Sequence, residues 1–148
     1  IKSPASMGLF YSWIFVFQIM KFAIVIYAAP YSSQAAQTAL YFARAVLSQG
    51  HEIYRVFFFG DGVHNANSLA VVAQDDQNLQ RAWDKLIKDN SIDSIVCVTS
   101  AIKRGILDAA EAKRYNLKNV SLLGSSEIAG LGQLIDATAN SDRVVNFG

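Results

Sequence analysis

Short apolar runs alternate with helical patterns along this chain. Residues 22–28 form a continuous apolar run of strand length, which is typical of a strand buried on both faces of a parallel sheet. Residues 53–59 and 92–98 are largely apolar and predict a second and a third strand, and residues 144–147 predict a last strand. Residues 120–123 form a further short apolar piece. Together these runs predict a sheet of about five strands.

Helical periodicity fills the intervals between the runs. Small and apolar residues recur at helical spacing over residues 36–47. Ser32 and Ser33 precede this stretch and can cap a helix, and Gly50 closes it. The same spacing predicts three more helices, over residues 79–87, over residues 108–115 and over a stretch with Ile128, Leu131, Leu134 and Ile135.

Strands that alternate with helices in this way predict an α/β fold. We expect a three-layer sandwich around a mostly parallel, doubly wound sheet with right-handed crossovers and a flavodoxin-like appearance. Open parallel sheets place their sites beyond the carboxyl ends of the strands. Three segments should therefore meet there: residues 29–34, 60–67 and 97–105. The second of these is rich in glycine and asparagine, so we expect a loop with positive φ angles.

The composition narrows the possible functions. The chain has 148 residues, of which 52% are hydrophobic and 17% charged, and this length suffices for one continuous core. Cys97 is the single cysteine, which excludes an internal disulfide, a cysteine-rich zinc site and a CxxC redox pair. The composition fits a reducing compartment. The balance of 13 basic against 12 acidic side chains argues against direct nucleic-acid binding.

The first 19 residues differ from the rest of the chain. Lys2 is their one charged residue, and their apolar run, residues 9–17, is shorter than the roughly 20 residues of a membrane helix. No small-x-small cleavage site follows it, so neither a membrane span nor a signal peptide is expected. We interpret residues 1–19 as an extension from an expression vector or from upstream translation, followed by one domain of residues 20–148. The alternative is that the run covers a partner surface.

Cys97 is the candidate nucleophile. It lies near the carboxyl end of a predicted strand and before a predicted helix start, with Lys103 and Arg104 shortly after it. A helix N-terminus and nearby cations both stabilise a thiolate. The competing interpretation is an inert core cysteine beside a solvated basic turn, because cysteine is among the most buried residue types and residues 95–98 are apolar. The pattern alone favours the inert thiol.

The other candidate groups carry weaker signals. His64 lies in the polar loop and could act as an acid, a base or a ligand, whereas His51 is expected to be structural. Asp75 and Asp76 are interpreted as a cap for the second helix, and no metal site is expected. The chain lacks the glycine-rich motifs of nucleotide sites, which leaves a weak phosphate site at residues 32–33 and no expected cofactor.

Five segments of the chain follow one another in a familiar order: residues 20–26, 57–67, 95–105, 130–132 and 142–147. Together they resemble the TusD proteins of the DsrE family, from Met20 to the last residue. The resemblance implies a cytoplasmic sulfurtransferase in which Cys97 carries sulfane sulfur as a persulfide. It therefore reverses the preference for an inert thiol. From their charge and position, Lys103, Arg104 and His64 are possible supporting residues. His64 stands where tyrosine is expected in related sequences, which leaves its role open.

The resemblance also implies partners. TusD-like proteins act with TusB-like and TusC-like subunits in a hetero-oligomer, which takes sulfur from a TusA-like donor and gives it to a TusE-like acceptor. This relay makes the 2-thiouridine of tRNA wobble positions, and thiol exchange in it requires no metal or organic cofactor. Two alternatives remain open: a DsrE-type subunit of intracellular sulfur oxidation, and a non-catalytic assembly subunit in which Cys97 belongs to the core.

Overall fold

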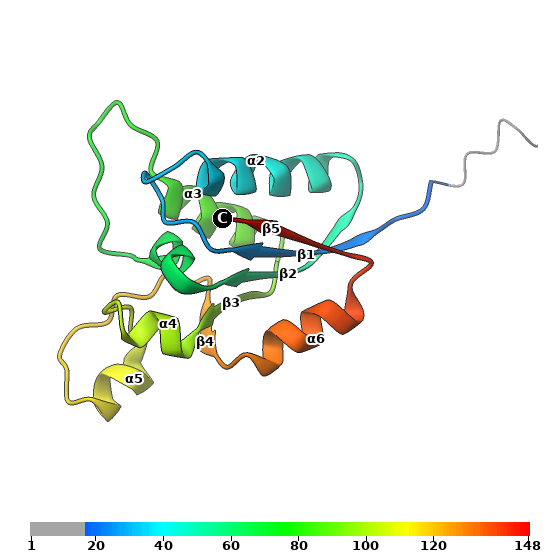
Figure 1. The fold of residues 1–148 in the computed structure, drawn as a ribbon. Coiled ribbons are helices and arrows are strands. Elements are labelled where there is room, and N and C mark those ends of the chain that lie inside the picture. Colours follow the sequence, from blue (N-terminus) through cyan, green and yellow to red (C-terminus); the bar gives the residue numbers. More distant parts are fainter. Residues whose placement is uncertain (1–16) are drawn as a thin grey trace, which may run out of the picture.

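The computed structural model describes residues 17–148, which fold around a single sheet (Figure 1). The strands are β1 (Lys21–Ile26), β2 (Glu52–Phe58), β3 (Ser94–Cys97), β4 (Glu127–Ala129) and β5 (Arg143–Phe147). Their order across the sheet is β4-β3-β2-β1-β5, and each neighbouring pair is parallel. The predicted sheet of about five mostly parallel strands is confirmed, and in the described part of the chain it is wholly parallel.

Helices lie on both faces of this sheet. The helical elements are α2 (Ala35–Ser48), the 3-10 helix η1 (Gly60–Ala66), α3 (Leu79–Asp89), α4 (Val98–Ile102), α5 (Ala109–Arg114) and α6 (Gly132–Asn140). α2 and α3 cover one face, and α6 lies on the opposite face (Figure 1). The strands β1 to β4 progress in one direction across the sheet, and α6 leads back to β5, so a right-handed connection places it on the other side. This is the predicted three-layer arrangement.

The two faces bury different side chains. The face toward α2 and α3 carries the larger cluster, in which Ile24 and Phe58 of the strands pack with helix residues. Trp83 of α3 is fully buried there and meets the Phe58 ring edge-on, with centroids 5.7 Å apart. The opposite face carries a small cluster made of Val25, Phe57, Ile95 and Cys97. Because strand side chains alternate between faces, Cys97 belongs to the α6 side.

Two predicted segments differ from the structure. Ile128, expected in a helix, pairs with Val96 as part of β4, and α6 begins only at Gly132. β4 is a three-residue edge strand, too short for an alternating pattern to identify it. Residues 120–123 do not join the sheet, since Leu122 makes only an isolated antiparallel bridge. The fourth strand is instead β4, which comes after residues 120–123 in the chain.

The helix starts also refine the predictions. Asn78 caps α3, because its side-chain oxygen accepts a hydrogen bond from the Arg81 amide at 2.9 Å. The interpretation of Asp75 and Asp76 as that cap is therefore wrong.

The apolar run of residues 9–17 lies, apart from its last residue, outside the described residues. Among residues 17–148, no helix has the length and apolar character that a membrane crossing requires.

Candidate functional site

The three segments expected at the carboxyl edge of the sheet do meet there. Asn65 of η1 is buried, and its side-chain amide donates a 3.0 Å hydrogen bond to the carbonyl of Ala28, just after β1. The Gly60 amide donates to the hydroxyl of Ser100 in α4, also at 3.0 Å. Hydrogen bonds thus join the segments that follow β1, β2 and β3 into one edge.

Gly62 explains how residues 60–67 pack so closely on this edge. The segment forms the 3-10 helix η1 instead of an open loop. A Cβ at position 62 would lie 1.9 Å from the carbonyl oxygen of Ile26, so only glycine allows this approach. The expected positive φ in this segment occurs at Gly60, at 56°.

Cys97 lies on the same edge but points into the small cluster on the α6 face. It is the last residue of β3 and pairs with Ala129 of β4. Its exposed fraction is 2%, and Phe59 and Leu134 pack against the cluster that contains it. The structure therefore combines both sequence interpretations, because the thiol is buried like a core cysteine and yet stands where the site segments meet.

A row of aromatic side chains connects the Cys97 cluster to solvent. Continuing the strand registers by one residue places Tyr27, Phe59 and Cys97 side by side across β1, β2 and β3. The rings of Tyr27 and Phe59 make an edge contact with centroids 5.5 Å apart. Tyr27 is 40% exposed. The apolar path therefore runs from an exposed tyrosine to a buried thiol.

The two cations after Cys97 are not brought to its sulfur. Arg104 donates through Nε to Asp61 at 2.9 Å and through Nη1 to the Ser100 carbonyl at 3.2 Å. These bonds fasten η1 to the end of α4, and Asp61 offsets the charge of the guanidinium. Lys103 is exposed at the end of α4. Geometry thus gives Arg104 a structural role at the edge.

The hydrogen bonds of the two histidines lead to residues outside the Cys97 cluster. The backbone carbonyl of His64 accepts a hydrogen bond from Gln80 of α3 at 3.3 Å, which ties η1 to the α2 and α3 side. His51 accepts the Met20 amide hydrogen through Nδ1 at 3.2 Å, and its ring stacks on Phe17 with centroids 6.0 Å apart. His51 is structural, as predicted.

A buried arginine on the α6 side was not found from the sequence. Arg55 of β2 is 8% exposed, and its Nη1 donates to Asp136 at 2.8 Å and to the Gln133 carbonyl at 2.6 Å, both in α6. Its Nε donates to Asp93, before β3, at 2.6 Å. A single arginine in an apolar run does not indicate such distant partners. The cluster fastens α6 to the sheet.

Tyr54 shares the carboxylate of Asp136. The β1–β2 register skips Tyr54, as in a β-bulge, which lets consecutive residues of one strand reach the same group. The Tyr54 hydroxyl donates to Asp136 at 2.9 Å, and this bond raises the pKa of Tyr54 above its usual 10.0. Burial alone would lower the pKa of Arg55, but Asp93 and Asp136 outweigh it and raise that pKa. Arg55 is therefore a fixed cation.

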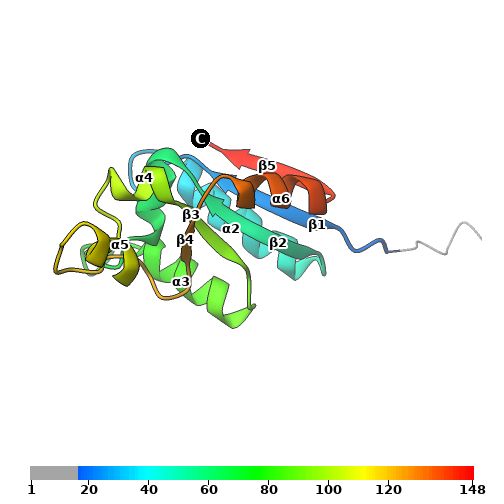
Figure 2. The ribbon, with the colours of Figure 1, turned by 90° about the horizontal axis from the view of Figure 1, so that it is seen from below.

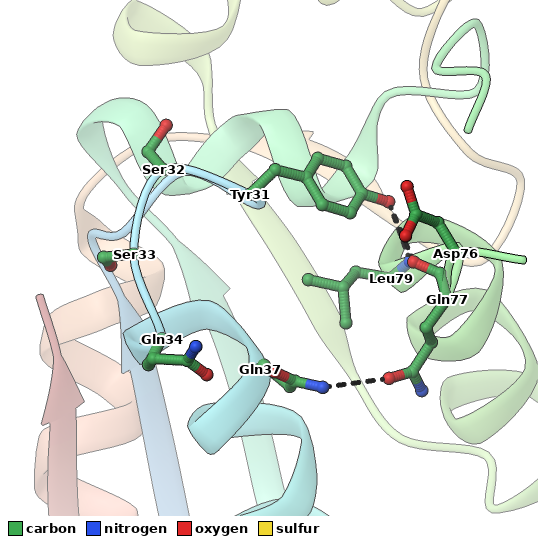
Figure 3. A pocket seen from close by; sticks show the side chains of 8 residues that line it. All are labelled: Tyr31, Ser32, Ser33, Gln34, Gln37, Asp76, Gln77 and Leu79. Atoms are coloured by element: carbon green, nitrogen blue, oxygen red, sulfur yellow. Dashed lines mark hydrogen bonds between the residues drawn. The ribbon is translucent and has the colours of Figure 1, made fainter. Parts of the chain in front are cut away.

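A pocket of about 470 Å³ opens on the other side, between the starts of α2 and α3 (Figure 3). The Tyr31 hydroxyl accepts the Leu79 amide hydrogen at 3.0 Å across one side of it. The pocket contains Ser32 and Ser33, which the sequence offered as a weak phosphate site. Its eight lining residues include Asp76 but no lysine or arginine, so the charge does not favour an anion.

Metal chemistry finds no support in the described part of the chain. Over residues 17–148, no group of three histidine, cysteine, aspartate or glutamate side chains is placed to hold an ion. What Cys97 brings to the carboxyl edge is one thiol in an apolar setting.

Comparison with known proteins identifies the family. The sequence profile of the DsrE/DsrF-like family matches residues 20–147. The chain belongs to this family. A protein named sulfurtransferase TusD homolog, from Pseudomonas aeruginosa, is 46% identical over 129 residues, which cover 87% of this chain and 98% of the relative. Sulfurtransferase TusD of Salmonella newport is 43% identical over 128 residues, covering 86% and 100%.

Two further similarities of this DsrE-family chain are informative. A DsrE protein of Allochromatium vinosum, provisionally named a sulfurtransferase, is 43% identical over 129 residues, or 87% of this chain and 99% of the relative. The crystal structure of the Escherichia coli protein ychN superposes with a TM-score of 0.70 at 23% identity, covering 87% of this chain and all of ychN. The predicted family, fold and sulfurtransferase class are thereby confirmed.

Proposed function

We propose that this DsrE-family protein carries sulfane sulfur as a persulfide on Cys97 and passes it between partner proteins. The observation that carries the proposal is the position of Cys97. The chain's single cysteine ends β3 at the edge where the segments after β1, β2 and β3 are joined. A sulfur carrier requires one thiol that another protein's cysteine can approach, and this edge is where open parallel sheets place their sites.

The transfer is a thiol exchange that balances without a co-reactant. The Cys97 thiolate attacks the outer sulfur of a donor persulfide, R–S–SH. The S–S bond of the donor breaks, the donor leaves as R–S⁻, and Cys97–S–SH forms with the proton on the transferred sulfur. Delivery repeats the step with an acceptor thiolate as nucleophile and Cys97–S⁻ as leaving group. Sulfur moves between equivalent bonds, so no external oxidant or reductant is consumed.

The surroundings of Cys97 suit storage of this labile group. Phe59, Ala129 and Leu134 pack against its cluster and limit the access of water and small thiols. A persulfide in this cluster would be shielded from the free thiols that otherwise reduce it. Release to a chosen acceptor would then depend on contact with that protein.

The same proposal places the chain in a cytoplasmic sulfur relay. Because relatives at 43–46% identity are named TusD, we infer a hetero-oligomer with TusB-like and TusC-like subunits. A TusA-like protein would donate the sulfur, and a TusE-like protein would accept it for the 2-thiouridine of tRNA. The near balance of basic and acidic side chains agrees with a protein that leaves the tRNA itself to others.

Mass spectrometry of the intact protein tests the carrier role. Incubation with a persulfidated donor protein should add about 32 Da, one sulfur atom, to the wild type. The Cys97→Ser variant should keep its mass, and a His64→Ala variant should gain sulfur like the wild type. A wild type that stays unmodified while the donor exchanges sulfur with a reference thiol protein would contradict the proposal. Transfer that persists in Cys97→Ala would instead indicate a non-catalytic assembly subunit.

A second destination for the sulfur is favoured by the similarity to the Allochromatium DsrE protein. In that case the chain would be a subunit of intracellular sulfur oxidation with the same carrier residue. Expression in a bacterium that lacks its own TusD separates the two. Restored 2-thiouridine in its tRNA supports the tRNA relay, and persulfidated Cys97 without restored 2-thiouridine supports sulfur oxidation.

A further inference from the structure

Gly130 and Leu131 link β4 to α6, whose first residue is Gly132, and neither glycine is required by the fold. Their φ angles are not positive, and a Cβ built at either position meets no described atom within 4 Å. Gly62 is the opposite case, where a Cβ would overlap a carbonyl. What glycine adds at positions 130 and 132 is therefore backbone freedom.

The link with its two glycines lies next to the candidate thiol. It begins directly after Ala129, which is the register partner of Cys97. β4 lies beyond β3 at the sheet edge, whereas α6 contacts β2 and β1, so the connection has to cross the end of β3. Figure 2, which views this side, shows the chain passing from β4 by the end of β3 to α6. Leu134, in the first turn of α6, packs on the Cys97 cluster.

Few buried apolar side chains hold α6 to the sheet. Ala137 is its one buried residue, and Ile135 is exposed. The firm attachment is polar, since Arg55 donates to the Gln133 carbonyl at 2.6 Å and to Asp136 at 2.8 Å. The Tyr54 hydroxyl adds a 2.9 Å bond to Asp136, so two side chains of β2 supply this attachment. A segment with few buried apolar contacts opens locally at lower free energy than the whole fold.

We propose that residues 130–134 form a strap over Cys97 that opens on Gly130 and Gly132, and that Arg55 holds it closed. The inference rests on the proposed carrier role, because a thiol that is 2% exposed must be uncovered before a donor persulfide can reach it. In the open strap the thiol is accessible to a partner's cysteine. In the closed strap the stored sulfur is shielded.

Alkylation of the folded protein measures this opening directly. Cys97 is the single cysteine, so the mass gained from iodoacetamide reports one site. Replacing both strap glycines, Gly130→Ala with Gly132→Ala, should slow alkylation roughly tenfold, because alanine restricts the open strap more than the closed one. The same variant should keep or raise the Tm, since the closed backbone accepts alanine without strain.

Gly124→Ala is the matched control. Gly124 precedes β4, and it also lacks a positive φ and has open space where a Cβ would lie. Its alkylation rate should stay within about twofold of the wild type, because any entropic stabilisation there acts on the whole fold and not on the strap. Urea well below the unfolding midpoint should leave the wild-type rate nearly constant, as expected for local opening.

Two results would overturn the strap. One is a double variant that alkylates as fast as the wild type, and the other is a wild-type rate that rises with urea as steeply as global unfolding does. Persulfide formation with an unchanged alkylation rate in the double variant would reject the strap and keep the carrier role. Slowed alkylation without persulfide formation in the wild type would reject the carrier role and keep the strap.

Discussion

The two faces of the sheet differ in what attaches their helices. Toward α2 and α3 the sheet presents a broad apolar cluster that includes the fully buried Trp83. Toward α6 it presents a small cluster around Cys97, and polar bonds from Arg55 supply much of the attachment. Stability is therefore concentrated on one face. The other face, which holds the candidate thiol, is built so that part of it can move.

The strongest test of this contrast is Trp83→Ala. Removing a fully buried indole that packs against Phe58 should lower the free energy of unfolding by about 3–5 kcal/mol. Urea denaturation followed by circular dichroism measures the loss. If Trp83→Ala lowered the free energy of unfolding by less than one of the substitutions on the α6 face, the contrast between the two faces would be contradicted.

Arg55→Met should have an intermediate effect on stability and a marked effect on access to Cys97. The free energy of unfolding should fall by about 2 kcal/mol. The fall stays moderate because Asp93 and Asp136, at 44% and 42% side-chain exposure, can be hydrated once the guanidinium is gone. Alkylation of Cys97 should become several times faster, because α6 is attached less firmly. The unfolding rate of the variant, measured in parallel, shows whether the gain exceeds that from global unfolding. The control is Lys85→Met, which breaks an exposed pair with Asp89 and should change neither quantity.

Leu134→Ala sharpens the comparison with a matched leucine on each face. Leu134 is partly buried over the Cys97 cluster, so its truncation should lower the free energy of unfolding by about 1 kcal/mol. Leu40 of α2 is fully buried, so Leu40→Ala should lower the free energy of unfolding by about 3 kcal/mol. Denaturation curves give both values, and equal losses would show that α6 is packed as firmly as α2.

The smallest expected effect is the pH dependence contributed by Asp84 of α3. Burial would raise the pKa of Asp84, but the ion pair with Lys88 at 2.7 Å outweighs it, and the pKa lies below its ordinary 3.8. A lowered pKa stabilises the fold above the unfolded value, and this contribution is lost as pH falls through the folded one. Asp84→Asn should therefore lower the free energy of unfolding by about 0.5 kcal/mol at neutral pH.

Thermal unfolding between pH 7 and pH 3 checks the direction of this effect. The difference between the wild type and Asp84→Asn should shrink once pH falls below the ordinary pKa of 3.8. A difference that grows toward acid would show that Asp84 is not held ionised by Lys88.

The sequence predicted the parts of this fold that local pattern determines. Largely apolar runs identified β1, β2 and β3, since strands covered on both faces of a sheet lack a regular alternation of polar and apolar residues. Ile128 was misplaced because its spacing from Leu131, Leu134 and Ile135 imitates a helix, whereas pairing with Val96 puts it in a short edge strand. Only the contact with β3 decides between these states, and that contact is not local.

The same limit applies to the candidate site. The topology rule placed residues 97–105 at the carboxyl edge, and the structure agrees. It could not show that the Cys97 side chain lies on the α6 face of the sheet. Nor could it show that Arg104 donates a hydrogen bond to Asp61, or that Arg55 donates one to the distant Asp136. Each of these depends on which strand face a side chain occupies and on partners from distant elements.

The pairing of β5 with β1 has a consequence for synthesis of the protein. Lys21 and Asp142, which are hydrogen-bonded where this pair begins, are 121 positions apart in the chain. While the ribosome has not yet released β5, one edge of β1 stays open and Phe42 lacks the cover that Phe147 later gives it. A chain in which β5 has not yet been made therefore leaves this edge of β1 unpaired, and an unpaired strand edge can pair with other chains.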